Sequence, residues 1–290
     1  MGHYFAAFYF KKRGVTLIMP ELPEVEVTRR GIEPYVVGQV ITNVAIHHAK
    51  LRWPVPKGLA KTLHNQTLIH LSRRGKYLLW QFPHGTLIIH LGMSGKLRIV
   101  TPTTPLQLHD HVEWIFNDNL AVRLNDPRRF GCVLWTAEPV EKHPLLAKLG
   151  PEPLSKAFSV AYLLSAIKGK HQAIKPWLMN NHNVVGVGNI YATEALFAAG
   201  INPTLPAQKL TTEQAQRLVP AIKKILQQAI KKGGTTLRDF LRSSGEPGYF
   251  SVHLSAYGRE HQPCFKCGTL LVSIRQAQRT TTYCPHCQKI

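Results

Sequence analysis

The stretch KYLLWQFPHGTLIIHLGMSGKLRIV, residues 76–100, decides the fold of the first part of the chain. It contains three short apolar runs, at 76–82, 86–91 and 96–100, separated by proline and glycine. Runs of this length between turn residues are typical of β-strands. Asn117-Asp118-Asn119 separates two further runs as a hairpin turn would. The other runs lie at 40–46, 67–71, 112–116, 121–124 and 132–135. So many short strands within about a hundred residues predict a β-sandwich or barrel.

Helical patterns lie on both sides of this β-rich region. Residues 21–35, before the strands, favour a helix, and the proline-rich segment 137–154 favours a connector. Apolar residues then recur at helical spacing from 215 to 230. Thr211 with Gln214 fits a capping box at the start of this run, and Gly233-Gly234 marks its end. Pro220 falls inside the run, where a proline is expected to kink a helix.

Four of the five cysteines form two Cys-x-x-Cys pairs near the end of the chain. The pairs are Cys264 with Cys267 and Cys284 with Cys287. Two such pairs match tetrahedral thiolate coordination, so they predict one structural zinc ion, with a hairpin between them at 270–274 and 280–283. A redox or disulfide role is the weaker alternative in a cytosolic chain. Cys132 lies in an apolar run and is expected to be a buried small hydrophobe.

The charge of the chain indicates a polyanionic partner. Lysine and arginine number 36 against 16 acidic residues, which gives a formal net charge of +20 and a pI near 10.0. Core packing does not require this excess, although a generally basic soluble surface is an alternative. No run approaches the roughly 18 apolar residues needed to span a membrane. In residues 1–18 the apolar stretch precedes the basic cluster, the reverse of a secretory signal, so we expect a cytoplasmic protein.

Residues 184–192, VVGVGNIYA, predict a tight glycine turn that opens a helix. The third glycine of a dinucleotide-binding motif is missing, but a helix N-terminus can still bind phosphate. Asn189 is expected to cap the helix, to donate to a phosphate, or both, and capping alone is the simpler interpretation. Upstream basic residues suit a surface that follows a nucleic-acid backbone: Lys168, Lys170, His171 and Lys175.

Residues 19–26 read MPELPEVE, which has the form of a protein's true beginning. Once uncovered, Pro20 is a secondary amine that can attack an aldehyde carbon and form a cationic iminium. Inside a chain, the same nitrogen belongs to an amide and has no usable lone pair. We therefore predict that the active protein begins at Pro20, through initiation at Met19 and methionine removal or through processing of the extension.

Taken together, these features resemble the formamidopyrimidine-DNA glycosylase family, bifunctional glycosylase/lyases of oxidised-purine repair. The resemblance runs from Met19 to about Lys289. It is carried by PELPEVE at 20–26, RRGKYLL at 73–79, HLGMSGKLR at 90–98, DPRRFG at 126–131, VVGVGNIYA at 184–192, GGTTLRDF at 233–240 and the final Cys-x-x-Cys pairs. The sister family, endonuclease VIII, shares this architecture, but its amino end usually has glycine where this chain has Leu22.

The resemblance implies an α+β protein with three folded parts. These are an N-terminal β-sandwich with flanking helices, a helix–two-turn–helix domain and a C-terminal zinc finger hairpin. The expected boundaries are an extension at 1–19, the catalytic sandwich at 20–136, a connector at 137–154, the DNA-binding helical domain at 155–254 and the zinc finger at 255–290.

The resemblance also implies roles for individual residues. Pro20 would attack C1′ of the damaged nucleotide, and Glu21 would protonate the sugar or the leaving base. Lys76 corresponds to the family's proton donor in elimination. Arg279 corresponds to the zinc-finger arginine that binds the lesion phosphate and acts in the second elimination. Glu24 is expected to help position the site or to pair with a basic residue.

Further matched positions imply contacts with DNA. His109, Arg128 and Lys170 resemble the family's DNA contacts, in addition to Asn189. Met93, Arg128 and Phe130 match the wedge that fills the space left by an extruded nucleotide, because apolar and planar groups replace lost stacking.

The leading hypothesis is a base excision repair enzyme that acts on damaged double-stranded DNA. It would excise 8-oxoguanine and formamidopyrimidines and cleave the strand by β- and δ-elimination. One alternative is a zinc-dependent lesion-binding protein without catalysis, preferred if Pro20 is not the N-terminus. Another is an endonuclease VIII-like preference for oxidised pyrimidines. Nothing in the sequence indicates an obligate oligomer, so a monomer is expected.

Overall fold

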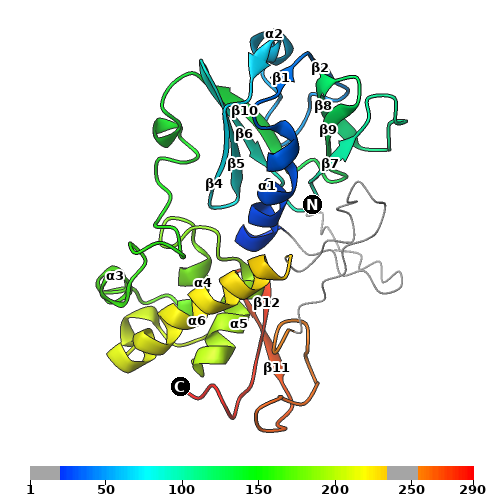
Figure 1. The fold of residues 1–290 in the computed structure, drawn as a ribbon. Coiled ribbons are helices and arrows are strands. Elements are labelled where there is room, and N and C mark those ends of the chain that lie inside the picture. The colour runs from blue at the N-terminus through cyan, green and yellow to red at the C-terminus, as the bar shows by residue number, and fades with distance from the viewer. Residues whose placement is uncertain (1–19, 234–253) are drawn as a thin grey trace, which may run out of the picture.

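The computed structural model describes residues 20–233 and 254–290 (Figure 1). Predictions for the extension at 1–19 and for all but the first residue of the motif at 233–240 lie outside the described residues. Within these ranges the chain forms a sandwich of two sheets, a set of helices and a small hairpin module. Among the described residues, no helix is long and apolar enough to cross a membrane.

Two four-stranded antiparallel sheets make up the N-terminal part. Their strand orders are β10-β6-β5-β4 and β2-β8-β9-β7, while β1 and β3 form a separate pair. The strands are β1 (Val40–Ile41), β2 (Asn43–Ile46), β3 (Gln66–Thr67), β4 (His70–Arg74), β5 (Tyr77–Phe82), β6 (Gly85–His90), β7 (Lys96–Val100), β8 (Asp110–Asn117), β9 (Leu120–Asn125) and β10 (Cys132–Thr136). The predicted sandwich is confirmed, and the barrel alternative is wrong because the two large sheets remain separate.

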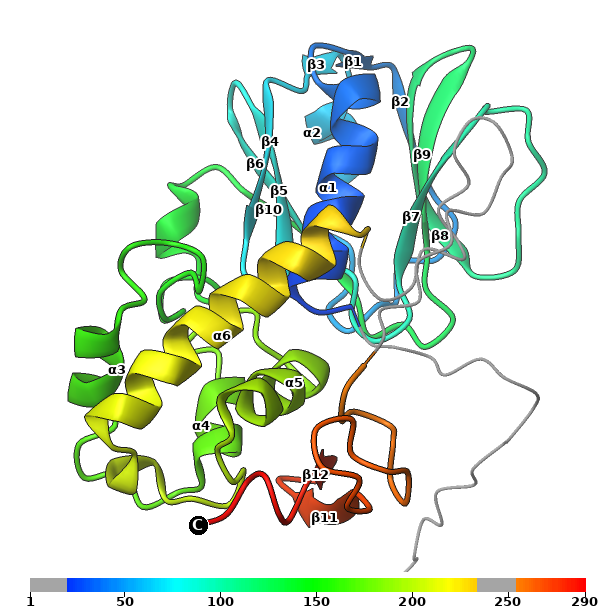
Figure 2. The same ribbon diagram turned by 60° about the horizontal axis from the view of Figure 1, so that its bottom comes forward.

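The two sheets enclose one apolar core. Trp80 of β5 and Trp114 of β8 connect the layers, with ring centroids 5.1 Å apart. Helix α1 (Leu22–Val36) runs along the space between the layers (Figure 2) and buries Val25 and Ile32 in the same core. The short helix α2 (Leu59–Leu63), which the sequence analysis did not predict, adds two buried leucines. Burial on this scale fixes the direction of α1 and therefore the position of its first residues.

Within the described residues, the helical part comprises four α-helices and one 3₁₀ turn, and a second 3₁₀ turn precedes it. The helices are α3 (Val160–Ala166), α4 (Ile174–Met179), α5 (Asn189–Ala199) and α6 (Thr212–Lys231), with η1 (Val140–Lys142) before them and η2 (Ala207–Lys209) between α5 and α6. The predicted capping box of Thr211 and Gln214 is confirmed at the start of α6. Helix α6 continues through Pro220, which is exposed, so water can serve the carbonyl to which a proline cannot donate.

The connector at 137–154 packs against the sandwich. Leu146 is buried with Leu79 and Ile88 in a small apolar cluster of its own. Its last residues reach the turn between β4 and β5, where Glu152 accepts a hydrogen bond from the backbone N–H of Gly75. The sequence pattern of prolines does not reveal this packing.

The C-terminal module is a β-hairpin flanked by cysteine pairs. Strands β11 (Val272–Gln276) and β12 (Arg279–Tyr283) pair in antiparallel register. Ala277 and Gln278 form the turn with φ values of 44° and 60°, the left-handed pair that a tight two-residue hairpin requires. The hairpin predicted from the sequence is confirmed. Arg279 opens the second strand and is exposed.

Candidate active site and zinc centre

The first residues of α1 lie against the start of α5. Glu21 is the N-cap of α1 and shares a capping box with Glu24. Its carboxylate also accepts hydrogen bonds from the backbone N–H groups of Gly188, at 2.8 Å, and Ile190, at 2.9 Å. A third N–H, that of Tyr191, donates over 3.4 Å. Free N–H groups at a helix N-terminus bind anions, and here they hold an acid from the other end of the chain.

The carboxyl group of Glu21 is almost fully buried, with 2% of the residue exposed. Burial disfavours the charged form and raises the pKa of Glu21 from 4.5 to about 6. The positive charge of Lys76 and the N–H groups of α5 oppose this rise, whereas the charge of Glu24 adds to it. Near neutral pH this acid can therefore both hold and release a proton.

Glycines allow this close approach. A Cβ atom at Gly188 would lie 2.3 Å from the carboxyl carbon of Glu21, and one at Gly186 would lie 2.8 Å from Leu22. Gly75, in the turn between β4 and β5, would meet Val185 at 2.3 Å. The glycines of the motif at 184–192 therefore bring the loop before α5 against the sandwich.

The turn between β4 and β5 carries Lys76 and is held by the connector. Glu152 accepts hydrogen bonds from the backbone N–H of Gly75, at 2.6 Å, and from the guanidinium groups of Arg73 and Arg74, at 2.9 and 3.1 Å. Arg74 also donates to carbonyls at residues 149 and 150. Five charged or dipolar contacts therefore fix the tip on which Lys76 lies, close enough for its charge to act on Glu21.

A buried lysine connects the helical part to the zinc module. Lys175 of α4, which is 1% exposed, donates to Asn189 Oδ1 and to Thr281 Oγ1, both at 2.7 Å. Burial lowers the pKa of Lys175 from 10.5 to about 7; the charge of Glu21 opposes this and that of Arg279 reinforces it. Glu21, Lys175 and Arg279 thus lie near one another, although they come from three parts of the chain.

Asn189 does not cap α5, so the capping interpretation is wrong. Gly188 occupies the N-cap position, and the side chain that accepts from the first N–H groups of the helix is that of Glu21. Asn189 is the first helical residue, and its side-chain oxygen accepts from Lys175. This bond orients the amide so that its NH₂ group is the donor that remains for a ligand. The alternative interpretation, donation to a phosphate, agrees with this geometry.

The residues expected to form the wedge lie on two loops that are hydrogen-bonded together. Ser94, next to Met93, donates to Asp126 at 2.6 Å and accepts from the backbone of Arg128 at 3.1 Å. The guanidinium of Arg128 lies over the ring of Phe130, 4.8 Å from its centroid, and both residues are exposed. The structure therefore places the loop with Met93 beside the loop with Arg128 and Phe130.

The wedge loops start beside the turn that carries Lys76. His90 at the end of β6 pairs with Tyr77 at the start of β5, and its Nδ1 accepts from Gly92 at 2.9 Å. Burial lowers the pKa of His90 to about 4, helped by the charges of Lys76 and Arg52, so its ring is neutral with the proton on Nε2. The catalytic candidates and the wedge candidates thus share one end of the first sheet.

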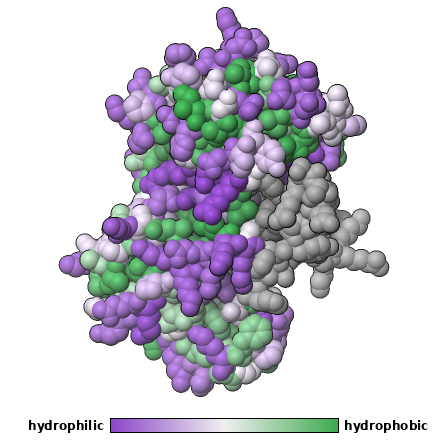
Figure 3. All heavy atoms as spheres, viewed as in Figure 1, coloured by the Kyte–Doolittle hydropathy of each residue, from purple (hydrophilic) through white to green (hydrophobic). Residues whose placement is uncertain are grey.

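The two remaining DNA-contact candidates lie on separate elements. His109 precedes β8 with a φ of 75°, and its carbonyl accepts from Asp126, which ties it to the loop that contains Arg128. Lys170 is exposed in the turn between α3 and α4. Hydrophilic residues gather on both sides of the waist between the two-sheet part and the helical part in Figure 3.

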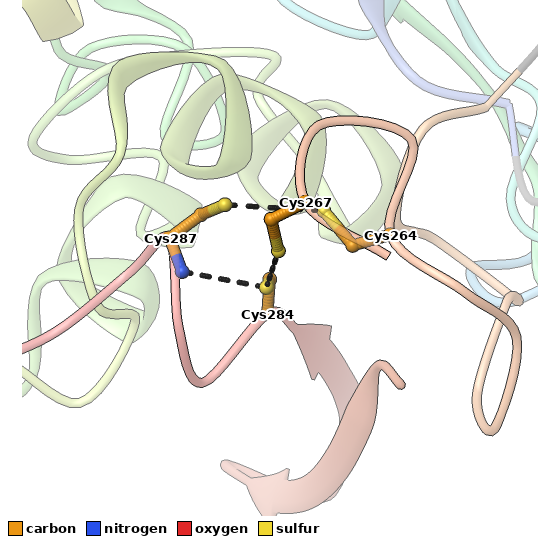
Figure 4. A group of neighbouring side chains, drawn as sticks. All are labelled: Cys264, Cys267, Cys284 and Cys287. Carbon is orange, nitrogen blue, oxygen red and sulfur yellow. Dashed lines mark hydrogen bonds between the residues drawn. The ribbon is translucent and has the colours of Figure 1, made fainter. Parts of the chain in front are cut away.

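The four predicted cysteines converge into one cluster (Figure 4). Their sulfur atoms all lie within 4.8 Å of one another, with 4.0 Å between Cys264 and Cys287 and 3.5 Å between Cys267 and Cys284. Four sulfurs about 2.3 Å from a tetrahedral zinc ion are roughly 3.8 Å apart, so the cluster fits the ion. Backbone N–H groups of Lys266 and Cys287 point at two of the sulfurs, as suits thiolates. Among the described residues this is the one such cluster.

Comparison with known proteins agrees with each part of this architecture. The formamidopyrimidine-DNA glycosylase N-terminal domain matches residues 19–133, and the H2TH domain of the same enzyme matches residues 149–241. A zinc finger found in FPG and IleRS matches residues 262–290. The chain belongs to the formamidopyrimidine-DNA glycosylase family. The zinc module is therefore the zinc finger of this family, and its four cysteines hold one structural zinc ion.

Similarity to individual members extends over their full length. A formamidopyrimidine-DNA glycosylase of Methylococcus capsulatus is 54% identical over 271 residues, which covers 93% of this chain and 100% of that protein. One from Shewanella denitrificans is 56% identical, covering 93% and 99%. A solved Lactococcus lactis complex with abasic-site DNA has a TM-score of 0.85 at 33% identity, covering 93% and 100%. The Thermus thermophilus structure has a TM-score of 0.81 at 37% identity, covering 93% and 98%.

Three residues of the site were not identified as such from the sequence. Lys175 was included only among basic surface residues, whereas it is buried between two domains. Glu152 lies in a segment interpreted as a connector, and Tyr191 lies in a motif whose interpretation rests on its glycines and Asn189. One signal was available for Lys175: it lies in an otherwise apolar run, IKPWLM, where a charge must find partners.

Proposed function

We propose that this protein is a base excision repair enzyme that removes oxidised purines from duplex DNA and then cleaves the strand. The observation that carries the proposal is the buried carboxyl group of Glu21, directly after Pro20, held by the first turn of α5 near the charge of Lys76. An acid that exchanges its proton near neutral pH is suited to assist an amine nucleophile.

The proposed reaction begins at the amine of Pro20. Its lone pair attacks C1′ of the damaged nucleotide, the bond from C1′ to the base breaks, and the base leaves with a proton. The bond from C1′ to the ring oxygen then opens to give an iminium. The base and the ring oxygen each take up one proton, of which the attacking amine gives one and protonated Glu21 supplies the other. A secondary amine forms a cationic iminium, which withdraws electrons for the steps that follow.

Strand cleavage follows from this iminium. Loss of a proton at C2′ breaks the bond from C3′ to its phosphate, and a second elimination breaks the bond at C5′. We assign proton donation in the first elimination to Lys76 and phosphate binding in the second to Arg279, whose guanidinium stays charged. Hydrolysis of the iminium then returns the free amine.

The DNA would be held by side chains around this centre. We propose that Asn189, His109, Arg128 and Lys170 bind the substrate, and that Met93, Arg128 and Phe130 fill the space of the extruded nucleotide. The net charge of +20 favours a DNA backbone as partner. We also propose a cytoplasmic location, where reducing conditions keep zinc-binding thiolates available.

The reaction needs a free amine at Pro20, and in the 290-residue chain this nitrogen is bonded to Met19. We therefore propose that the reactive form begins at Pro20. In support, the family match starts at residue 19, and 93% of this chain spans the whole of the Methylococcus capsulatus relative. Intact-mass measurement of protein from its native host tests this directly.

Borohydride trapping on a duplex that contains 8-oxoguanine opposite cytosine tests the chemistry. Protein that begins at Pro20 should become covalently linked to the DNA and should cleave it. The 290-residue chain is the matched control, since it has every side chain but no amine at Pro20, and it should not link. Failure of the shorter protein to link would contradict the proposal. Faster cleavage of a duplex with an oxidised pyrimidine would favour the endonuclease VIII-like alternative.

A further inference from the structure

Tyr191 in the first turn of α5 contacts both Glu21 and Glu24, the two acids at the start of α1. Tyr191 is 1% exposed, and its phenol donates to Glu24 Oε1 at 2.7 Å. The other oxygen of the same carboxylate, Oε2, accepts from the backbone N–H of Glu21 at 2.9 Å. Tyr191 thus reaches the backbone beside Pro20 through one intervening carboxylate.

The backbone N–H at the end of this chain of bonds belongs to the peptide unit that joins Pro20 to Glu21. A peptide unit is planar, and its six atoms include the Cα of the residue before it. Fixing the N–H of Glu21 therefore fixes the plane that contains the Cα of Pro20. The nitrogen of Pro20 is bonded to that Cα, so its position depends on the same plane.

We propose that Tyr191 is a positioning residue that acts through Glu24 to orient Pro20 for attack on the sugar. The inference rests on the proposed function, because it assigns a new residue to that same site. The phenol links the helical domain to the first turn of α1, and its partner Glu24 is 167 residues away in sequence. Small misplacements of a reacting group lower rates strongly, so one such bond matters more for reaction than for folding.

A second tyrosine of the helical domain provides a matched control. Tyr162 of α3 donates from its phenol to the carbonyl of Asn183 at 2.6 Å, a bond of similar length within the same domain. Its phenol bonds neither Glu21 nor Glu24. Loss of either hydroxyl removes one short hydrogen bond, so the two losses should destabilise the protein to a similar extent. Only the loss at Tyr191 should affect the reaction.

The experiment compares Tyr191→Phe and Tyr162→Phe in protein that begins at Pro20. This protein corresponds to the part of the chain that the relatives match. Single-turnover base excision should fall roughly tenfold in Tyr191→Phe and stay within about twofold in Tyr162→Phe. Binding to a duplex with an uncleavable abasic analogue should change by less than about twofold in both, because neither phenol is proposed to contact DNA. Equal loss of rate in the two variants would overturn the inference.

A double-mutant cycle tests the route through Glu24. Adding Tyr191→Phe to Glu24→Ala should lower the excision rate no further, since the connection is already broken. Glu24→Gln serves if the shorter side chain prevents folding. Additive losses would overturn the inference, because Tyr191 would then act independently of Glu24.

Unfolding of the same four proteins by denaturant separates this inference from the proposed function. Tyr191 and Glu24 should show a coupling free energy in that cycle whether or not the protein excises bases. An unmodified protein that excises no base overturns the proposed function. Absence of coupling in a protein that does excise overturns this inference alone.

Discussion

The zinc finger and the start of α1 position their proposed catalytic residues by opposite means. In the zinc finger, two pairs of cysteines close in sequence converge on one point, and Arg279 lies on the hairpin between them. At the start of α1, the carboxylate of Glu21 is held by α5, and the turn before β5 that carries Lys76 is held by the connector. One site is built from a local motif, the other from contacts across the whole chain.

This difference indicates where each site is vulnerable. Metal coordination concentrates the folding free energy of a small module in a few bonds, so loss of one ligand removes the whole module. The α1 site is held by many hydrogen bonds of modest strength to a well-packed scaffold. Single changes there should displace one group and leave the fold intact.

The largest expected effect is removal of zinc. Cys284→Ser, or a strong chelator, should unfold the hairpin that carries Arg279 and lower strand cleavage by at least about a hundredfold. Because the sandwich core is separate from the zinc module, its unfolding midpoint should change little. Cleavage and thermal unfolding measured on the same samples check this. Cys132→Ser, a change at the buried cysteine outside the cluster, is the control.

Gly188→Ala should have the next largest effect. The added methyl would lie 2.3 Å from the carboxyl carbon of Glu21, so the acid must leave its place on α5. We expect base excision to fall by about a hundredfold while the zinc finger still binds its metal. Single-turnover kinetics and zinc content measure the two sites separately. In a Glu21→Ala background the methyl has room, and a further large loss there would contradict the explanation.

The third largest effect is expected in the pH dependence of base excision, which reports on the site at the start of α1. The pKa of Glu21 is raised to about 6, and an ordinary terminal amine has a pKa near 8. The product of protonated acid and free amine is then level between these values and falls about tenfold per pH unit outside them. Excision should therefore decline below about pH 6 and above about pH 8. The alkaline limb reflects loss of the proton of Glu21, so it should vanish in Glu21→Gln, while the decline at low pH, where the amine is protonated, should remain. An alkaline limb unchanged in that variant would show that another group titrates.

Glu152→Gln should have the smallest effect of the four. It weakens the contacts that hold the turn with Lys76, but the backbone of that turn remains packed on Val185. We expect strand cleavage at an abasic site to fall about threefold to tenfold, with zinc binding unchanged. Glu141→Gln, at an exposed acid of the same connector, is the control and should leave cleavage unaltered. A loss as large as that of Gly188→Ala would place Glu152 at the reacting atoms instead.

What could be predicted from the sequence divides in the same way, into local motifs, which were predicted, and contacts between distant segments, which were not. The strands, the capping box of α6 and the zinc cluster were predicted because alternation, spacing and ligand chemistry are local. The capping role of Asn189 was predicted wrongly, because its side chain is instead bound by Lys175 from another helix. No local pattern shows which buried lysine will find an asparagine and a threonine from distant segments.

The sequence by itself determined the strands and helices, the zinc ligands and the family, since each depends on residues near one another in the chain or on their order. Only the tertiary structure decided that Glu21 lies on the N-terminus of α5, that Glu152 holds the turn of Lys76 and that Tyr191 reaches Glu24. Those contacts join residues tens to hundreds of positions apart. Burial of two apolar cores brings them together, and the raised pKa of Glu21 exists only once that burial is complete.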